Sequence, residues 1–217
     1  MKKLLLSVIA IIVSITSFAQ EKNVTKFLEI PVDGTKTEMI AKLKEKGFTS
    51  TEYDKDVLEG EFNGADVYLH IATNNNNVYR IMVSDKNTTN ETNIKIRFNK
   101  LCQQFNNNPK YSYAGDQMIA EDEDISYAMS VKNKRYQAIY HQVDREKLGK
   151  ALLDKYSVEQ IQDQENWSEE FKLDFARTTM EYCINKSVWF MISEFGGEYY
   201  ITIFYDNGLN KANGEDL

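Results

Sequence analysis

The chain has 217 residues, of which 42% are hydrophobic, and its formal net charge is −7. With 13 tyrosines, 11 phenylalanines and two tryptophans, it can fill a substantial hydrophobic core, as one large domain or two small ones. The acidic balance argues against nucleic acid as a partner, because phosphate binding requires a concentrated basic patch.

The first 19 residues have the pattern of a secretory signal peptide. Two lysines precede an apolar run from Leu4 to Val13, and Ser17 and Ala19 occupy the −3 and −1 positions of a cleavage site. The run is shorter than the roughly 20 residues of a membrane span, so we expect cleavage after Ala19 and a periplasmic or extracellular protein. Because Gln20 stands where a lipoprotein has cysteine, no lipid anchor is expected. Cleavage would change the net charge from −7 to −9.

Residues 20–88 are predicted to form a first αβ unit. The stretch EIPVDGTKTEMIAKLKEKGF begins a helix with a capping box of Thr35 and Glu38, and Gly47 ends it. The segment DGTK lacks the further glycines of a phosphate-binding loop. The runs VLEGEF, ADVYLHIAT and VYRIMV, with turns at Asn63-Gly64 and Asn74 to Asn77, predict a β-meander. Alternation directs one set of side chains inward and places Tyr68 and His70 on the opposite face. The inward set is Leu58, Phe62, Val67, Leu69, Ile71, Ile81 and Val83.

Residues 89–217 are predicted to form a second, similar unit. A helix from about Thr92 to Phe105 precedes ISYAMSV and RYQAIYHQV, which we expect to be strands joined by a turn at Lys132 to Lys134. The strands SVWFMISEF and EYYITIFY meet at Gly196-Gly197, and DNGLNKANGEDL is typical of a frayed tail. The predicted class is therefore α+β, with antiparallel sheet or sheets from two helix-plus-meander units.

A helical insertion, about residues 144–184, interrupts the second unit. Asp144 can cap its first helix, Ser157 with Gln160 a second, and Ser168 a third. We expect this insertion to pack over a face of the sheet. The alternative is that it is the part of the chain that gives this protein its distinct function.

The phrase IPVDGTKTEMIAKLKEKGF followed by VLEGEFNGADVYLHI resembles uncharacterised exported proteins of gut bacteria, in which a similar helix opens an αβ unit. This resemblance extends over most of the mature chain. Over about twenty residues, the same start resembles the αβ module of outer-membrane-assembly lipoproteins and of the β-lactamase-inhibitor-like fold. The resemblance implies an antiparallel sheet backed by helices, and it brings no known catalytic residues.

The residues that could carry chemistry form no recognised motif. His70 and His141 lie on predicted strands of different units, and neither H-E-x-x-H nor a cysteine pair at ligand spacing is present, so we expect no metal or cofactor. Cys102 and Cys183 could form a disulfide in an oxidising compartment, or Cys102 could be a buried thiol on an apolar helix stripe. The acidic run 121–124 does not match a calcium loop and indicates a solvated loop.

Aromatic residues on the last two strands are more suggestive of function. Both faces of this hairpin are apolar, with Trp189 and Met191 alternating with Phe190 and Ile192. Either the insertion covers the second face, or that face presents aromatic residues to a protein or glycan. The candidate surface residues are Tyr68, Trp189, Tyr200 and Phe204, and Tyr68 could contribute only if both units share one sheet.

The sequence thus favours a non-catalytic exported binding or interaction module over an enzyme. A proteinaceous inhibitor of an extracytoplasmic enzyme is one alternative, suggested by the fold-level resemblance. An unrecognised hydrolase is another, and it would need a deep pocket that gathers a histidine with carboxylates.

Overall fold

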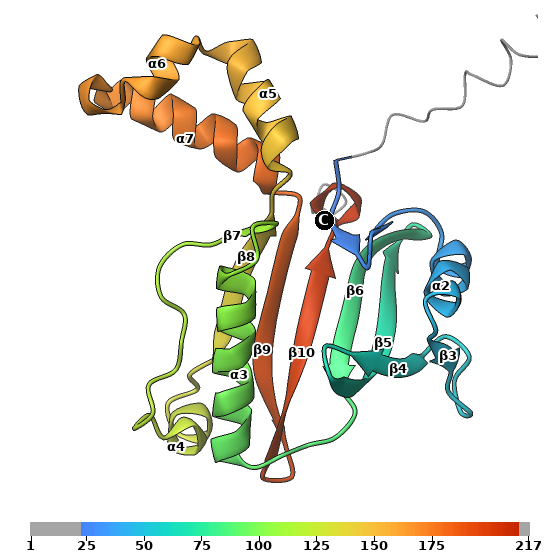
Figure 1. Ribbon diagram of the computed structural model, residues 1–217. Coiled ribbons are helices and arrows are strands. Elements are labelled where there is room, and N and C mark those ends of the chain that lie inside the picture. The colour runs from blue at the N-terminus through green and yellow to red at the C-terminus, as the bar shows by residue number, and fades with distance from the viewer. Residues whose placement is uncertain (1–22, 213–217) are drawn as a thin grey trace, which may run out of the picture.

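A computed structural model describes residues 23–212, and these form an α+β fold around one eight-stranded antiparallel sheet (Figure 1). The strand order is β3-β4-β5-β6-β10-β9-β8-β7, and a separate two-stranded ladder, β1-β2, precedes it in the chain. The predicted signal peptide lies outside the described residues. The strands are β1 Lys26–Phe27, β2 Ile30–Pro31, β3 Thr49–Ser50, β4 Leu58–Phe62, β5 Ala65–Asn74, β6 Asn77–Asp85, β7 Tyr111–Ser112, β8 Gln137–Gln142, β9 Ser187–Phe195 and β10 Glu198–Asp206.

The two predicted units join at strands β6 and β10. These strands pair antiparallel, with Thr202 opposite Ser84 and Phe204 opposite Met82. Each unit contributes four strands to the eight-stranded sheet of the described chain, and their buried side chains form one hydrophobic cluster. The condition for Tyr68 to share a surface with the second unit is therefore met.

The predicted helix starts are confirmed where a cap was identified. Helix α2 (Lys36–Glu45) has the full capping box, because Thr35 accepts from the Glu38 amide and Glu38 accepts from the Thr35 amide. Helix α3 (Glu91–Asn106) is capped by Asn90 and begins one residue before the predicted start. Their apolar faces cover the same side of the sheet, and Figure 1 shows α3 lying along the strands.

The core lies between these helices and the sheet. Phe98 on α3 contacts Phe190 edge to face at 4.9 Å, and Phe105 stacks on Tyr140 at 4.6 Å. All the strand residues predicted to face inward in the first meander are buried except Phe62, which is half-buried and packs against the same cluster.

The hairpin turns follow the sequence rule at three places and break it at one. Asn63-Gly64, Asn75-Asn76 and Gly196-Gly197 all have positive φ, as two-residue hairpin loops require. The loop between β1 and β2 has the same geometry but consists of Leu28 (φ +50°) and Glu29 (φ +66°). A left-handed conformation costs such residues about 1–2 kcal/mol each.

The prediction that ISYAMSV is a strand was wrong. Ile125–Ser130 is a short helix, α4, because the Asp124 carboxylate accepts from the Tyr127 amide and caps it. The buried residues Ile125 and Ala128 are three apart, a helical spacing. Apolar alternation over seven residues did not distinguish the two structures.

The prediction of a frayed tail was also wrong for residues 206–212. Asn207 is 1% exposed and its side-chain amide donates to the Val32 carbonyl at 2.8 Å. Asn210, in the 3-10 helix η2 (Gly208–Asn210), donates to Asp33 and to the Val78 carbonyl. Side-chain amides therefore fix this segment against the first unit.

The helical insertion is present, but it does not cover the sheet. It comprises α5 (Arg145–Lys155), α6 (Val158–Gln162), the 3-10 helix η1 (Gln164–Asn166) and α7 (Glu169–Cys183), with the predicted caps at Asp144, Ser157 and Ser168. Helix α5 packs against α7, and the insertion extends beyond one end of the strands (Figure 1). Trp167, Phe171 and Phe175 form its own aromatic cluster around Tyr156. The favoured expectation that it packs over the sheet was wrong.

Candidate functional site

The face of the sheet opposite α2 and α3 carries the candidate surface residues. Strand alternation buries Val188, Phe190 and Ile192 toward the helices, and leaves Trp189 and Met191 half-buried on the other side. We call this other side the open face, because the helices of the described residues pack on the core side or beyond the strand ends. Residues brought together there by pairing are Tyr68, His70, Arg80, Met82, Ser84, Ile139, Trp189, Met191, Tyr200, Thr202, Phe204 and Asp206.

An aromatic stack lies near the centre of the open face. The rings of Trp189 and Phe204 are cross-strand partners, stacked at 3.9 Å between centroids and 12° between planes. Met82 lies opposite Phe204, and Ile139, which is 42% exposed, lies opposite Trp189. Four strands therefore contribute to one apolar band.

An ion pair holds one side of this stack. Arg80 Nε and Nη2 bind the two carboxylate oxygens of Asp206 at 2.5 and 2.6 Å. Trp189 Nε1 donates to the same carboxylate at 3.2 Å, and the Arg80 guanidinium lies 5.0 Å from the Phe204 ring centroid. The bidentate bond to Asp206 also raises the pKa of Arg80. Sequence reasoning missed both charged residues, since Asp206 was placed in the tail and Arg80 was identified only as part of the strand VYRIMV.

Tyr68 and Tyr200 lie farther from the stack. Tyr68 on β5 is opposite Ser84, whose hydroxyl is hydrogen-bonded to that of Thr202 at 2.8 Å. Tyr200 on β10 is opposite Ser193, toward the Gly196-Gly197 turn. Both tyrosines are half-buried, and the four candidate residues thus lie on one continuous face.

The two histidines do not form a common site. His70 on β5 and His141 on β8 are separated in the sheet by β6, β10 and β9. Burial lowers the pKa of each, so both favour the neutral form. Within residues 23–212, no group of three or more histidine, cysteine, aspartate or glutamate side chains is arranged to hold a metal ion.

Both cysteines are free and buried. Burial raises the pKa of the Cys102 and Cys183 thiols, which is the opposite of the shift that activates a cysteine nucleophile. The acidic run has structural partners: Asp124 caps α4, and Glu123 binds Lys134 at 2.6 Å.

A scan against protein-family models and searches of curated proteins and of solved structures found no match. Across the described residues, no helix combines the length and apolarity needed to cross a membrane.

Proposed function

We propose that this chain is an exported, non-catalytic binding protein whose open face docks a protein partner. The observation that carries the proposal is the uncovered Trp189–Phe204 stack with its Arg80–Asp206 pair. Tryptophan, tyrosine and arginine are the residues most enriched among energetic hot spots of protein interfaces. The signal-like N-terminus supports export, and the resemblance to exported proteins agrees with it.

The arrangement of the stack favours a protein over a glycan. An aromatic platform for a sugar needs a free ring face, but Trp189 and Phe204 stack on each other, and the Arg80 guanidinium lies 5.5 and 5.0 Å from their ring centroids. Met82 and Met191 extend the band on neighbouring strands, and their flexible thioethers suit contact with apolar side chains. The polar pair beside the band is already satisfied internally, so a partner would cover it without leaving an unpaired charge.

The edges of the sheet support docking on the face rather than strand addition. The outermost strands, β3 and β7, have two residues each. An added peptide strand would find few backbone groups to pair with at such short edges.

The test compares capture by matched variants of the mature chain, residues 20–217. The bait variants are wild type, Tyr200→Ala on the open face, and Tyr127→Ala as a control. Tyr127 is 51% exposed on α4, on the helix-bearing side. Each bait is incubated with the extracytoplasmic fraction of its native cell, and retained proteins are identified by mass spectrometry.

A protein retained by wild type and Tyr127→Ala but lost or strongly reduced with Tyr200→Ala would support docking on the open face. Circular dichroism must show that both variants keep the wild-type fold. Equal retention by all three baits would contradict the use of this face. If the specific partner is an enzyme, an activity assay with added wild-type protein distinguishes an inhibitor from another kind of binding protein.

A further inference from the structure

Two adjoining cavities lie on the other side of the sheet, between the N-terminal segment and α3. The first has a volume of about 580 Å³ and the second about 610 Å³. They share five lining residues, so they form one continuous groove. These shared residues are Leu28, Phe62, Asn108, Tyr111 and Tyr205.

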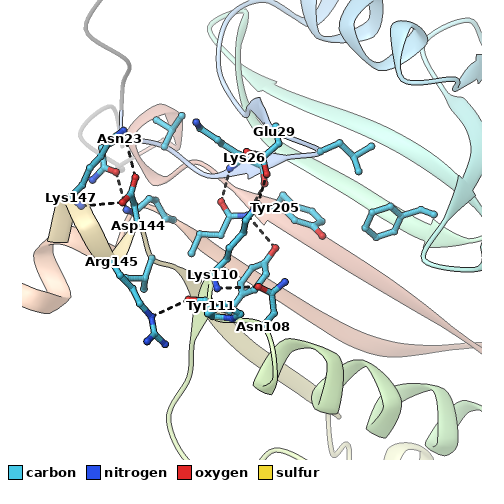
Figure 2. A pocket seen from close by; sticks show the side chains of 17 residues that line it. Asn23, Lys26, Glu29, Asn108, Lys110, Tyr111, Asp144, Arg145, Lys147 and Tyr205 are labelled. Carbon is cyan, nitrogen blue, oxygen red and sulfur yellow. Dashed lines mark hydrogen bonds and ion pairs between the residues drawn. The ribbon is translucent and has the colours of Figure 1, made fainter. Parts of the chain in front are cut away.

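The first cavity is basic, although the chain as a whole is acidic. Its lining contains five basic side chains and two acidic ones, Glu29 and Asp144. They come from the N-terminal hairpin, from the residue before β7, from the start of α5 and from the residue before β9, and Figure 2 labels all of them except Lys186. The basic residues are Lys26, Lys110, Arg145, Lys147 and Lys186. This excess of positive charge complements an anionic group.

Lys186 gives this cavity a desolvated cation. The residue is 3% exposed, and its ammonium group donates to the Asn23 side chain at 2.9 Å and lies 3.9 Å from the Tyr182 ring centroid. Burial lowers the pKa of Lys186, and a nearby anion would favour its charged form.

The second cavity is mainly apolar. Its lining is dominated by aliphatic and aromatic side chains, with one basic and one acidic residue, Lys46 and Glu61. The apolar part comprises Leu28, Phe48, Phe62, Leu101, Phe105, Tyr111, Ile203 and Tyr205. The groove is therefore cationic at one end and apolar at the other.

The hairpin that lines both cavities is held in a specific conformation. The Gln142 side chain bonds both the amide and the carbonyl of Lys26, each at 2.7 Å, which ties the hairpin to β8. The hairpin loop places Leu28 in the lining of both cavities while its backbone is left-handed. Since the two-residue hairpin loops of the eight-stranded sheet consist of asparagine and glycine, a strained leucine here indicates that its side chain is needed.

We propose that this groove binds an amphiphilic monoanion of the fatty-acid type, with the carboxylate at the basic end and the alkyl chain in the apolar end. The binding site is separate from the open face and uses different chemistry. Apolar contact with Leu28 holds the alkyl chain of the ligand, and the basic residues that line the first cavity select for a negatively charged head group.

The probe is dodecanoate at neutral pH and below its micellar concentration, titrated into the mature protein by calorimetry. Acetate has the same carboxylate without the alkyl chain, and dodecyltrimethylammonium has the same chain with a positive charge. We expect one dodecanoate per chain, no measurable binding of acetate, and binding of the cation at least tenfold weaker. From octanoate to dodecanoate, affinity should rise about fourfold for each added methylene group.

Two variants test the two ends of the groove. Leu28→Gly removes the side chain and suits the left-handed backbone, so dodecanoate binding should weaken at least fivefold while the melting temperature stays equal or rises. Arg145→Glu should weaken binding to a similar extent. Arg135→Glu is the control. Arg135 precedes the first residue of β8, whereas Arg145 follows the last, so this variant makes the same charge change outside the groove lining and should leave the affinity for dodecanoate unchanged.

Failure of dodecanoate to bind would overturn the proposal, as would equal binding of the cationic amphiphile. Binding that is unaffected by both Leu28→Gly and Arg145→Glu would place the fatty acid elsewhere and also contradict it. If an acidic peptide such as hexaglutamate binds while dodecanoate does not, the groove recognises peptide carboxylates instead and the proposal is wrong.

Discussion

The ion pair of Arg80 and Asp206 fixes the positions of the side chains around it on the open face. Asp206 is only 9% exposed at its side chain and accepts bonds from Arg80 and from Trp189 Nε1. Arg80→Met would keep much of the apolar contact with Phe204 but leave the carboxylate without its cation. We expect a loss of about 2 kcal/mol in unfolding free energy, less than for a fully buried pair because Arg80 is 20% exposed and partly screened by solvent.

Urea denaturation of single and double variants measures this coupling. Adding Asp206→Asn to Arg80→Met removes the unpaired charge and keeps an oxygen for Trp189, so the double variant should be more stable than the sum of the two single effects predicts. Lys172→Met is the control, because its partner Glu169 is 85% exposed and the change should stay within about 0.5 kcal/mol. Simple additivity at Arg80 and Asp206 would show that the pair does not stabilise the face.

The sequence predicted the face of the sheet on which a side chain lies wherever that face follows from strand alternation. Tyr68, Trp189, Tyr200 and Phe204 were assigned to the face on which they lie, since a strand has a period of two. It did not predict that Arg80 and Asp206 would meet. Their 126-residue separation is bridged only by pairing of β6 with β10, which no local pattern encodes.

At the scale of elements, the predictions succeeded where side chains bond to the backbone next to them. The caps at Thr35, Asp144, Ser157 and Ser168 are local hydrogen bonds and could be identified directly. Helix α4 was missed because its six residues contain too few turns to separate helical from strand periodicity. The position of the insertion was missed because its apolar residues pack on one another, which a sequence pattern does not distinguish from packing on a sheet.

The insertion should be removable without loss of the sheet. The backbone amide of Gln142 donates to the Lys186 carbonyl at 2.9 Å, and His141 is paired with Ser187 in the sheet. Strands β8 and β9 are therefore already adjacent where the insertion begins and ends. Replacing residues 144–184 by Asn-Gly would close this point as a two-residue hairpin. We expect a cooperatively folded protein whose melting temperature falls by less than about 8 °C, or roughly 2 kcal/mol.

Far-UV circular dichroism and urea denaturation check this deletion. The loss of α5 to α7 should reduce the helical signal while the partner that depends on Tyr200 is still captured. Dodecanoate binding should weaken, because Asp144, Arg145 and Lys147 line the groove. A product that binds hydrophobic dyes and unfolds without a cooperative transition would show that the insertion is needed for the core.

At the scale of the whole molecule, the repeated helix-plus-meander pattern allowed two domains or one. The pairing of β6 with β10, which we call the seam, joins the two units into one sheet. The buried cluster extends from Met39 in the first unit to Ile203 in the second. Neither half can cover its inner strand without the other. The two units should therefore unfold together, in one transition.

Two single-tryptophan proteins can test this cooperativity. Trp167→Phe leaves Trp189 as the reporter of the second unit, and Tyr68→Trp with both native tryptophans changed to phenylalanine reports the first. In each protein, Ile203→Ala at the seam should lower stability by about 2–4 kcal/mol, since Ile203 is 3% exposed. Because the core is shared, both reporters should shift by the same amount and coincide with circular dichroism. A first-unit reporter that kept its own midpoint while the second shifted would mean that the seam joins two independent domains, and that the open face is assembled from parts able to move apart.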